Sequence, residues 1–197
     1  MSNTIDYYNK NADAFAKETQ SLDFSVTQEK FLSYLKEGDL ILDFGCGAGR
    51  DTKYFLDHGY RVEAMDGSEA LCKIASRYTG IEVKHKYFEE LEESRKYDGI
   101  WACSSILHLP YDALVEVLKK MQKALKPSGI IYTSFKYGDF AGERHGRYFM
   151  NFTQASFASL LSQVGGLTIV EEWITGDVRH DREEERWLNV LLRRSQL

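Results

Sequence analysis

A glycine-rich segment that starts with an acidic residue has the residue types and spacing most suggestive of chemistry. It reads Asp43-Phe44-Gly45-Cys46-Gly47-Ala48-Gly49-Arg50. A turn without side chains lets a ligand approach the backbone, and a helix beginning near Arg50 would offer unpaired N–H groups to an anion. The dinucleotide fingerprint is G-x-G-x-x-G, whereas here the third glycine, Gly49, comes one residue early. An ordinary strand-to-helix turn needs only one glycine, so the pattern favours a ligand-binding turn.

A second acidic residue, Asp66, ends the next apolar run, 17 residues beyond Gly49. At this place in a nucleotide-binding unit, an acidic residue can accept both hydrogen bonds of a ribose diol. The alternative is that Asp66 caps the helix that follows, which is a common role for aspartate. Its position after the glycine-rich turn favours the ribose role.

Short β-type runs alternate with amphipathic helices over the first two thirds of the chain. Strands are predicted over 40–44, 60–65, 81–87, 97–103 and 130–136. Strands that alternate with helices imply βαβ units and a parallel sheet with helices on both faces.

Helices are indicated at two places by their own signals. Before the first strand, Ser25 and Gln28 form a capping-box signature at the start of a helix. Before the last predicted parallel strand, a helix with apolar residues at helical spacing is ended by Lys126-Pro127-Ser128-Gly129.

The C-terminal third follows a different pattern. Residues 137–152 are predicted to be a long loop with three glycines, and a helix follows at about 153–164. Two β-type runs, 167–174 and 186–192, are joined by a polar connection too short for a parallel crossover, so an antiparallel pair at the sheet edge is expected. The fold class is α/β, with a single Rossmann-like sheet of seven strands, mostly parallel with an antiparallel C-terminal strand.

The composition excludes several classes of protein. The chain of 197 residues is 43% hydrophobic and 28% charged, which is globular, and we expect a single domain over 1–197. The formal net charge of -5 makes nucleic acid an unlikely partner. Three cysteines without a CxxC pair indicate neither disulfides nor a metal site. No signal-peptide layout and no membrane-spanning stretch is present, so a cytoplasmic location is expected.

These motifs resemble those of the class I S-adenosylmethionine (SAM)-dependent methyltransferases. The family's first motif is an acidic residue followed by G-x-G-x-G, and Asp43 to Gly49 match it. The run 97–108 resembles the family's fourth strand and the segment after it, and Lys126 to Gly129 resemble its K-P-G-G turn. Within the class, the chain is similar to small methyltransferases of the tellurite-resistance type, through Gly49-Arg50-Asp51 and Trp101 to His108.

The resemblance implies a set of cofactor-binding residues and SAM as the cofactor. The N-terminal helices, 1–37, would cover the cofactor, with an aromatic face of Tyr8 toward the sulfonium. Arg50 would pair with the methionyl carboxylate or simply be exposed on its helix, and Glu89 with the Phe88 backbone would hold the adenine. The implied cofactor-binding residues are Tyr8, Asp43, Gly45, Cys46, Gly47, Arg50, Asp66, Gly67, Ser68, Phe88, Glu89 and Cys103.

The acceptor is expected at the same rim, because ligands of open α/β sheets bind outside the carboxyl ends of the strands. Residues 137–152 begin there, and long loops are often lids or binding loops. The predicted substrate residues are Lys136, Arg144, Arg147 and Tyr148, and His108 is a candidate general base. A solvated charged loop is the alternative.

We therefore expect a methyltransferase that acts on a small-molecule acceptor. A soft acceptor such as a thiol needs little help from a base, whereas an oxygen or nitrogen acceptor would draw on His108 or on the 137–152 segment. A SAM-binding module without turnover is one alternative. An NAD(P)-dependent oxidoreductase is another, which the early third glycine disfavours.

Overall fold

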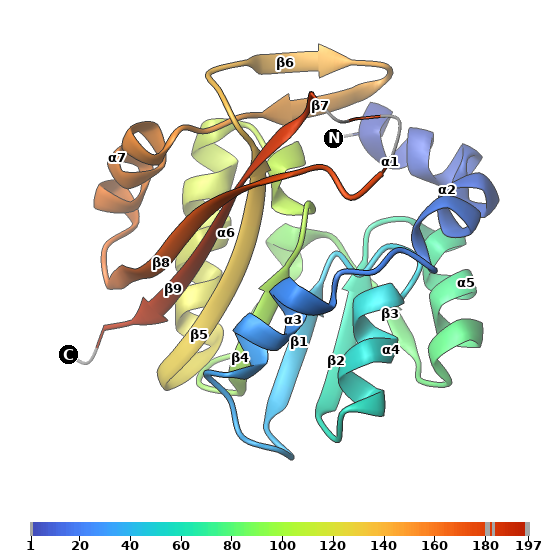
Figure 1. Ribbon diagram of the computed structural model, residues 1–197, viewed down its shortest axis with the longest axis horizontal. Helices are drawn as coiled ribbons and strands as arrows, with labels where there is room; N and C mark the ends of the chain where they lie inside the picture. Colours follow the sequence, from blue (N-terminus) through green and yellow to red (C-terminus); the bar gives the residue numbers. More distant parts are fainter. Residues whose placement is uncertain (1, 180–181, 183, 196–197) are drawn as a thin grey trace.

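The computed structural model describes residues 2–179, 182 and 184–195, and a seven-stranded sheet forms its centre (Figure 1). The strands lie in the order β3-β2-β1-β4-β5-β9-β8. Neighbouring strands from β3 to β5 are parallel, and β9 is antiparallel to both β5 and β8. The predicted fold class is therefore confirmed. The strands of this sheet are β1 (Leu40–Phe44), β2 (Arg61–Asp66), β3 (Val83–His85), β4 (Tyr97–Ala102), β5 (Leu125–Lys136), β8 (Leu167–Gly176) and β9 (Arg186–Arg194).

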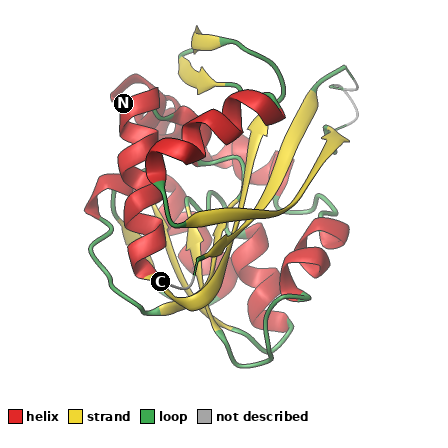
Figure 2. Ribbon diagram, turned by 90° about the vertical axis from the view of Figure 1, so that its left-hand side faces the viewer, coloured by secondary structure: helices red, strands yellow, loops and turns green. Residues whose placement is uncertain are grey.

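Helices cover both faces of the sheet (Figure 2). On one face, Phe31 and Phe55 pack against Ile41 of β1 and against β4. On the other face, the apolar sides of two helices, including Leu118 and Leu160, form the larger part of the core. The helices of the first face are α3 (Ser25–Leu32), α4 (Arg50–Asp57) and α5 (Glu69–Thr79), and those of the second are α6 (Tyr111–Ala124) and α7 (Gln154–Val164). Two further helices, α1 (Ser2–Lys10) and α2 (Ala12–Thr19), lie beyond the carboxyl ends of the strands (Figure 1).

The alternation of side chains along β1 decides where its acidic residue points. Successive strand residues face opposite sides of a sheet. Leu42 and Phe44 pack into the core on the α6 side, and Ile41 packs on the α3–α4 side. Asp43 therefore faces α4, where its carboxylate accepts a hydrogen bond from Thr52 Oγ1 at 2.5 Å.

An aromatic cluster fills the space between α3, α4 and the middle of the sheet. Trp101 of β4 stacks on Tyr132 of β5 with ring centroids 4.0 Å apart, and the edges of Phe31 and Phe55 contact it. Trp101 is fully buried, so its indole N–H needs a partner inside the protein. That partner is Asp51, the second residue of α4.

The segment predicted as a loop over 137–152 is instead largely a β-hairpin. Its strands are β6 (Ala141–Arg144) and β7 (Arg147–Met150), which pair antiparallel. The two turn residues, His145 and Gly146, have φ of 50° and 75°, as two-residue hairpin turns require. The hairpin lies over the same rim as α1 (Figure 1), and the Tyr148 N–H donates to Thr4 Oγ1 at 3.0 Å.

Two local predictions were wrong. Ser25 is the first residue of α3 and not its N-cap, which is Phe24, and no side chain makes a capping hydrogen bond there. The helix predicted to stop at Lys126 to Gly129 does end just before that segment, at Ala124, but β5 begins at Leu125 and not at residue 130.

The C-terminal elements agree with the prediction. The helix predicted at about 153–164 is α7, whose Thr153 side chain caps its N-terminus. The predicted antiparallel pair is formed by β8 and β9 at the sheet edge. Within the described part of the chain, every helix is too short or too polar to cross a bilayer.

Candidate active site

A cavity of about 200 Å³ lies at the carboxyl ends of the parallel strands. One part of it, here called the β1 side, is lined by Gly45, Cys46, Gly47, Ala48, Asp66, Gly67, Tyr87, Phe88, Ser105 and Leu109. The other part, here called the β9 side, is lined by Ser104, Ser134, Thr175, Gly176, Asp177, Val178, Arg179, Trp187 and Asn189. Residues of α1, α2 and the segment before α3 cover the cavity: Thr4, Ile5, Tyr8, Phe15, Thr19, Leu22 and Phe24. The remaining lining residues are Arg50, Asp51, Leu71, Cys103 and His108.

The three glycines of the turn after β1 have different roles. All three have positive φ: 85° at Gly45, 56° at Gly47 and 89° at Gly49. Gly45 and Gly47 line the cavity, and a Cβ at Gly45 would lie 2.5 Å from Ser105 Cβ. A Cβ at Gly49 would instead lie 2.8 Å from Thr79 Cγ2 on α5. The third glycine thus permits helix packing, and the first two keep the cavity open.

Asp66 lines the cavity and braces the glycine turn at the same time. Its Oδ2 accepts the Gly47 N–H at 2.9 Å, and its Oδ1 accepts the Ser68 N–H at 2.8 Å. The N-cap of α5 is Ser68, whose hydroxyl accepts the Leu71 N–H, so the capping role does not fall to Asp66. Burial raises the pKa of Asp66, which the two backbone N–H groups partly counteract. Each carboxylate oxygen retains a lone pair for a ligand hydroxyl.

Asp43 supports the turn from beneath and does not line the cavity. Burial, reinforced by the nearby Asp51 carboxylate, raises the pKa of Asp43 to about 8. The predicted Ser68 is likewise buried outside the cavity, where its hydroxyl donates to Asn9. The predicted Glu89 is exposed on the short 3-10 helix Phe88–Glu90, whereas the Phe88 ring lines the cavity.

His108 lies in the cavity wall with both ring nitrogens engaged. It ends the 3-10 helix Ile106–His108. Its Nδ1 lies 2.6 Å from the Tyr148 carbonyl, and its Nε2 lies 2.9 Å from the Tyr8 hydroxyl. A carbonyl only accepts, so Nδ1 carries the proton. Burial lowers the pKa of His108 to about 4, so the ring is neutral near pH 7 and Nε2 accepts from Tyr8.

The burial of His108 predicts a pH-dependent loss of stability. Its pKa is about 4 when folded and about 6.5 when unfolded. Between these values the unfolded state binds the extra proton, so stability falls as the pH is lowered. From pH 7 to 4.5 this group alone should cost about 2 kcal/mol.

The measurement is denaturant unfolding of the wild type and of His108→Gln at both pH values. Glutamine can donate to Tyr148 and accept from Tyr8 without titrating. The variant should lose less stability on acidification than the wild type. His58→Gln, at an exposed site just after α4, is the control and should follow the wild type. Equal losses in His108→Gln and the wild type would contradict the assignment.

The four predicted substrate residues lie around the cavity, and none of them is in its wall. Lys136 pairs with Glu185 at 2.7 Å. Arg144 stacks on the Phe140 ring, and Arg147 lies 4.4 Å from the centre of the Tyr7 ring. The Tyr148 backbone N–H donates to Thr4 Oγ1, and its carbonyl accepts from His108 Nδ1. Of the predicted cofactor residues, nine line the cavity together: Tyr8, Gly45, Cys46, Gly47, Arg50, Asp66, Gly67, Phe88 and Cys103.

Sequence reasoning missed most of the β9 side. There the Asp177 carboxylate accepts hydrogen bonds from Arg179 Nε and Nη2 and from the Trp187 indole. These donors, set against burial, lower the pKa of Asp177 to about 2. In the sequence, the signal for this side was Asp177 directly after Gly176 at the end of β8, followed by Arg179 and Arg182.

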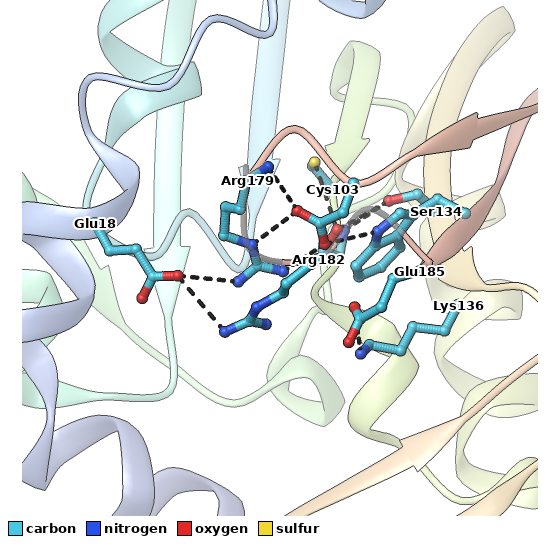
Figure 3. A network of polar contacts seen from close by, with 10 residues as sticks. Glu18, Cys103, Ser134, Lys136, Arg179, Arg182 and Glu185 are labelled. Atoms are coloured by element: carbon cyan, nitrogen blue, oxygen red, sulfur yellow. Dashed lines mark hydrogen bonds and ion pairs between the residues drawn. The ribbon is translucent and has the colours of Figure 1, made fainter.

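An ion-pair network joins the β9 side to the helices that cover the cavity (Figure 3). Arg179 Nη1 lies 3.4 Å from Glu18 of α2, and Arg182 Nη2 lies 3.6 Å from the same oxygen. Segments about 160 residues apart in sequence therefore meet over the cavity.

Comparisons with known proteins find similarity to methyltransferases. Residues 41–129 match the family model described as a methyltransferase domain. The N-terminal Xaa-Pro-Lys N-methyltransferase 1 of Danio rerio is 32% identical over 125 residues, which is 56% of each chain. The alpha N-terminal protein methyltransferase 1 of Caenorhabditis elegans is 33% identical over 116 residues, 52% of this chain and 50% of the relative. The chain thus spans about half the length of the curated relatives it matches.

Solved structures share the fold over nearly the whole chain. The 1,6-didemethyltoxoflavin-N1-methyltransferase of Burkholderia thailandensis, solved with its substrate and S-adenosylhomocysteine, has a TM-score of 0.76 at 24% identity. The similarity covers 98% of this chain and 85% of that one. The magnesium protoporphyrin IX methyltransferase of Synechocystis PCC 6803, with bound S-adenosylhomocysteine, has a TM-score of 0.74 at 17% identity, over 96% and 97%.

Residues 41–129 thus match a methyltransferase domain and contribute the strands β1 to β4 of the central sheet. Both of these solved structures hold S-adenosylhomocysteine, the product form of S-adenosylmethionine. The β1 side would fit this group: Gly45 has no room for a Cβ, Asp66 would offer carboxylate oxygens to the ribose, and Phe88 and Leu109 would provide apolar surface for the adenine.

Proposed function

We propose that the protein transfers the methyl group of SAM to a small acceptor bound on the β9 side. The observation that carries this proposal is the continuity of the cavity. The β1 side continues, past Cys103 and Ser104, into the β9 side, whose wall comes from β5, β8, β9 and the residues after β8. SAM supplies a methyl group already activated by its sulfonium. The main task of the protein is then to align the acceptor with it and to exclude water.

The polar groups of the cavity wall favour an acceptor that can attack the methyl group without a general base from the protein. The carboxylates among the described lining residues are Asp51, Asp66 and Asp177, and each already accepts several N–H groups. His108 Nε2 is engaged by Tyr8. We therefore infer a soft or uncharged nucleophile, such as a thiol or a heteroaromatic nitrogen, and the aromatic rings of Phe24 and Trp187 suit a planar acceptor.

The proposed size of the acceptor rests on how the β9 side is covered. Glu18 and Arg179 bridge α2 to residues after β8 directly over it, which suits a small molecule. A protein N-terminus is the alternative, because the curated relatives are named for methylating such termini. The likeness to tellurite-resistance-type methyltransferases in Gly49-Arg50-Asp51 and Trp101 to His108 is also part of this proposal, and it makes a chalcogen oxyanion a further candidate.

Calorimetry and a turnover assay test the proposed function. S-adenosylhomocysteine should bind with micromolar or tighter affinity, and NADH should bind at least about a hundredfold more weakly. Formation of S-adenosylhomocysteine from SAM is then measured with thiols, heteroaromatic amines, selenite, tellurite and an Xaa-Pro-Lys peptide. We expect turnover with a thiol or a heteroaromatic amine.

Three outcomes would contradict the proposal in different ways. Tighter binding of NADH than of S-adenosylhomocysteine would favour an oxidoreductase. Turnover with the peptide alone would replace the small acceptor by a protein. Tight S-adenosylhomocysteine binding without turnover on any acceptor would favour a SAM-binding module.

A further inference from the structure

A largely buried carboxylate in the cavity wall accepts four hydrogen bonds. Asp51, on the first turn of α4, is 7% exposed. Its Oδ1 accepts Gln28 Nε2 of α3 at 2.6 Å and Arg50 Nε at 2.8 Å. Its Oδ2 accepts Trp101 Nε1 of β4 at 2.8 Å and Arg50 Nη2 at 2.9 Å. Three separate elements thus converge on one carboxylate.

The geometry of this contact is unusual for neighbours on a helix. Adjacent helical residues point about 100° apart and do not normally face each other. Here the Arg50 fork turns back onto the carboxylate of the next residue, which Gln28 and Trp101 hold in place from α3 and β4. The guanidinium is held from a third direction by the Phe24 ring, whose centre lies 4.6 Å away. The orientation of Arg50 is therefore set by Asp51 and the Phe24 ring, and Asp51 is in turn held by Gln28 and Trp101 from outside the helix.

Arg50 lies where a fixed guanidinium can donate a hydrogen bond to a ligand in the cavity. Arg50 lines the cavity beside Cys103, with Nη2 at 3.8 Å from the sulfur. Its Nη1 makes no hydrogen bond to any residue that the structure describes. The other arginine in the wall, Arg179, is held on one edge by Asp177 and on the other by Glu18. Among the described lining residues, Arg50 is thus the arginine with a whole nitrogen, Nη1, that makes no hydrogen bond and can donate to a ligand.

We propose that Asp51, held by Gln28 and Trp101, is a positioning residue that fixes the Arg50 guanidinium for the carboxylate of the cofactor's methionyl group. This inference rests on the proposed function, because it concerns the same cofactor. A bidentate Arg–carboxylate pair is rigid, and a rigid donor loses less entropy when the ligand binds. Without Asp51, the Arg50 side chain would become ordered only when the ligand binds, and the entropy lost would weaken binding.

The experiment compares two ligands that differ in the amino-acid end. S-adenosylhomocysteine carries the methionyl carboxylate and amino group, whereas 5′-methylthioadenosine keeps the nucleoside and the sulfur and lacks both. Asp51→Asn removes the charge and one acceptor oxygen while keeping the size of the side chain. We expect it to weaken S-adenosylhomocysteine binding at least tenfold in calorimetry and to change 5′-methylthioadenosine binding less than twofold. Asp57→Asn, on an exposed residue of the same helix, should change neither.

Two further variants test the route through Arg50. Arg50→Gln should weaken S-adenosylhomocysteine binding relative to 5′-methylthioadenosine binding, as Asp51→Asn does. The double variant Arg50→Gln/Asp51→Asn should bind S-adenosylhomocysteine less than twofold more weakly than Arg50→Gln alone, because the effects of coupled residues are not additive. Gln28→Met removes one donor to Asp51 at nearly constant volume. It should weaken S-adenosylhomocysteine binding three- to tenfold. If Asp51→Asn does not fold, Gln28→Met takes its place as the test.

The outcomes separate this inference from the proposed function. Equal weakening of both ligands would mean that Asp51 only supports the fold, and would overturn the inference. Unchanged S-adenosylhomocysteine binding in Asp51→Asn would overturn it as well, while leaving the proposed function standing. Failure of both ligands to bind the wild-type protein would overturn the proposed function and the inference with it.

Discussion

Gly45→Ala is expected to destabilise the protein by about 2–5 kcal/mol and to weaken S-adenosylhomocysteine binding by about tenfold or more. The φ of Gly45 is 85°, a conformation that costs an alanine roughly 1–2 kcal/mol. The new Cβ would also lie 2.5 Å from Ser105 Cβ and 3.1 Å from the Phe88 ring. Relieving this overlap moves the cavity wall and costs a further ~1–3 kcal/mol. Denaturant unfolding and calorimetry measure the two effects.

Gly38→Ala is the matched control for the conformational part. Gly38 has nearly the same φ, 82°, but a Cβ there meets nothing within 4 Å. Its loss of stability should therefore be only about 1 kcal/mol, with S-adenosylhomocysteine binding unchanged. Equal losses in the two variants would show that the contact with Ser105 relaxes freely, and would contradict the assigned role of Gly45.

Asp66→Ala is expected to reduce S-adenosylhomocysteine affinity by about a hundredfold or more, close to 3 kcal/mol. The carboxylate serves the proposed ribose contact, and it also holds the Gly47 and Ser68 N–H groups. Removing it leaves these two donors without their partner, at about 1–3 kcal/mol for each buried group. The glycine turn should then lose its shape even before a ligand binds.

Glu63→Gln provides the comparison for Asp66→Ala. Glu63 stands three residues earlier on β2 and outside the cavity, where it pairs with Lys96 at 2.7 Å. Its replacement should leave S-adenosylhomocysteine affinity unchanged in calorimetry. An Asp66→Ala protein that retains wild-type affinity would refute both the ribose contact and the bracing of the turn.

The β1 side could be predicted from the sequence because local signals encode it. The apolar run of β1, the glycines after it and Asp66 at the end of β2 lie within 27 residues, and parallel strands bring their carboxyl ends to one rim. Even here Asp43, one of the implied cofactor-binding residues, does not line the cavity. The alternation of side chains along β1 turns Asp43 toward Thr52 of α4.

The β9 side could not be predicted in the same way because distant pairings create it. Asn189 lies in the cavity wall, and its position follows from the antiparallel pairing of β9 with β5, where it faces Ser134. The hairpin of β6 and β7 left only a weak signal, since its strands have four residues each. Its turn uses His145 before Gly146, where asparagine or aspartate is usual.

The bridge between Glu18 and Arg179 joins chain segments on both sides of the matched domain, which spans 41–129. The glycine turn and Asp66 lie inside that interval, whereas the β9 side, apart from Ser104, is built from residues after it, and the helices that cover the cavity come from residues before it. We expect such an arrangement to be modular, so that the flanking segments can be exchanged while the methyl donor stays the same. A chimera that receives residues 1–24 and 134–189 of a methyltransferase of the same fold should therefore inherit its acceptor, because those segments build most of the β9 side and its cover.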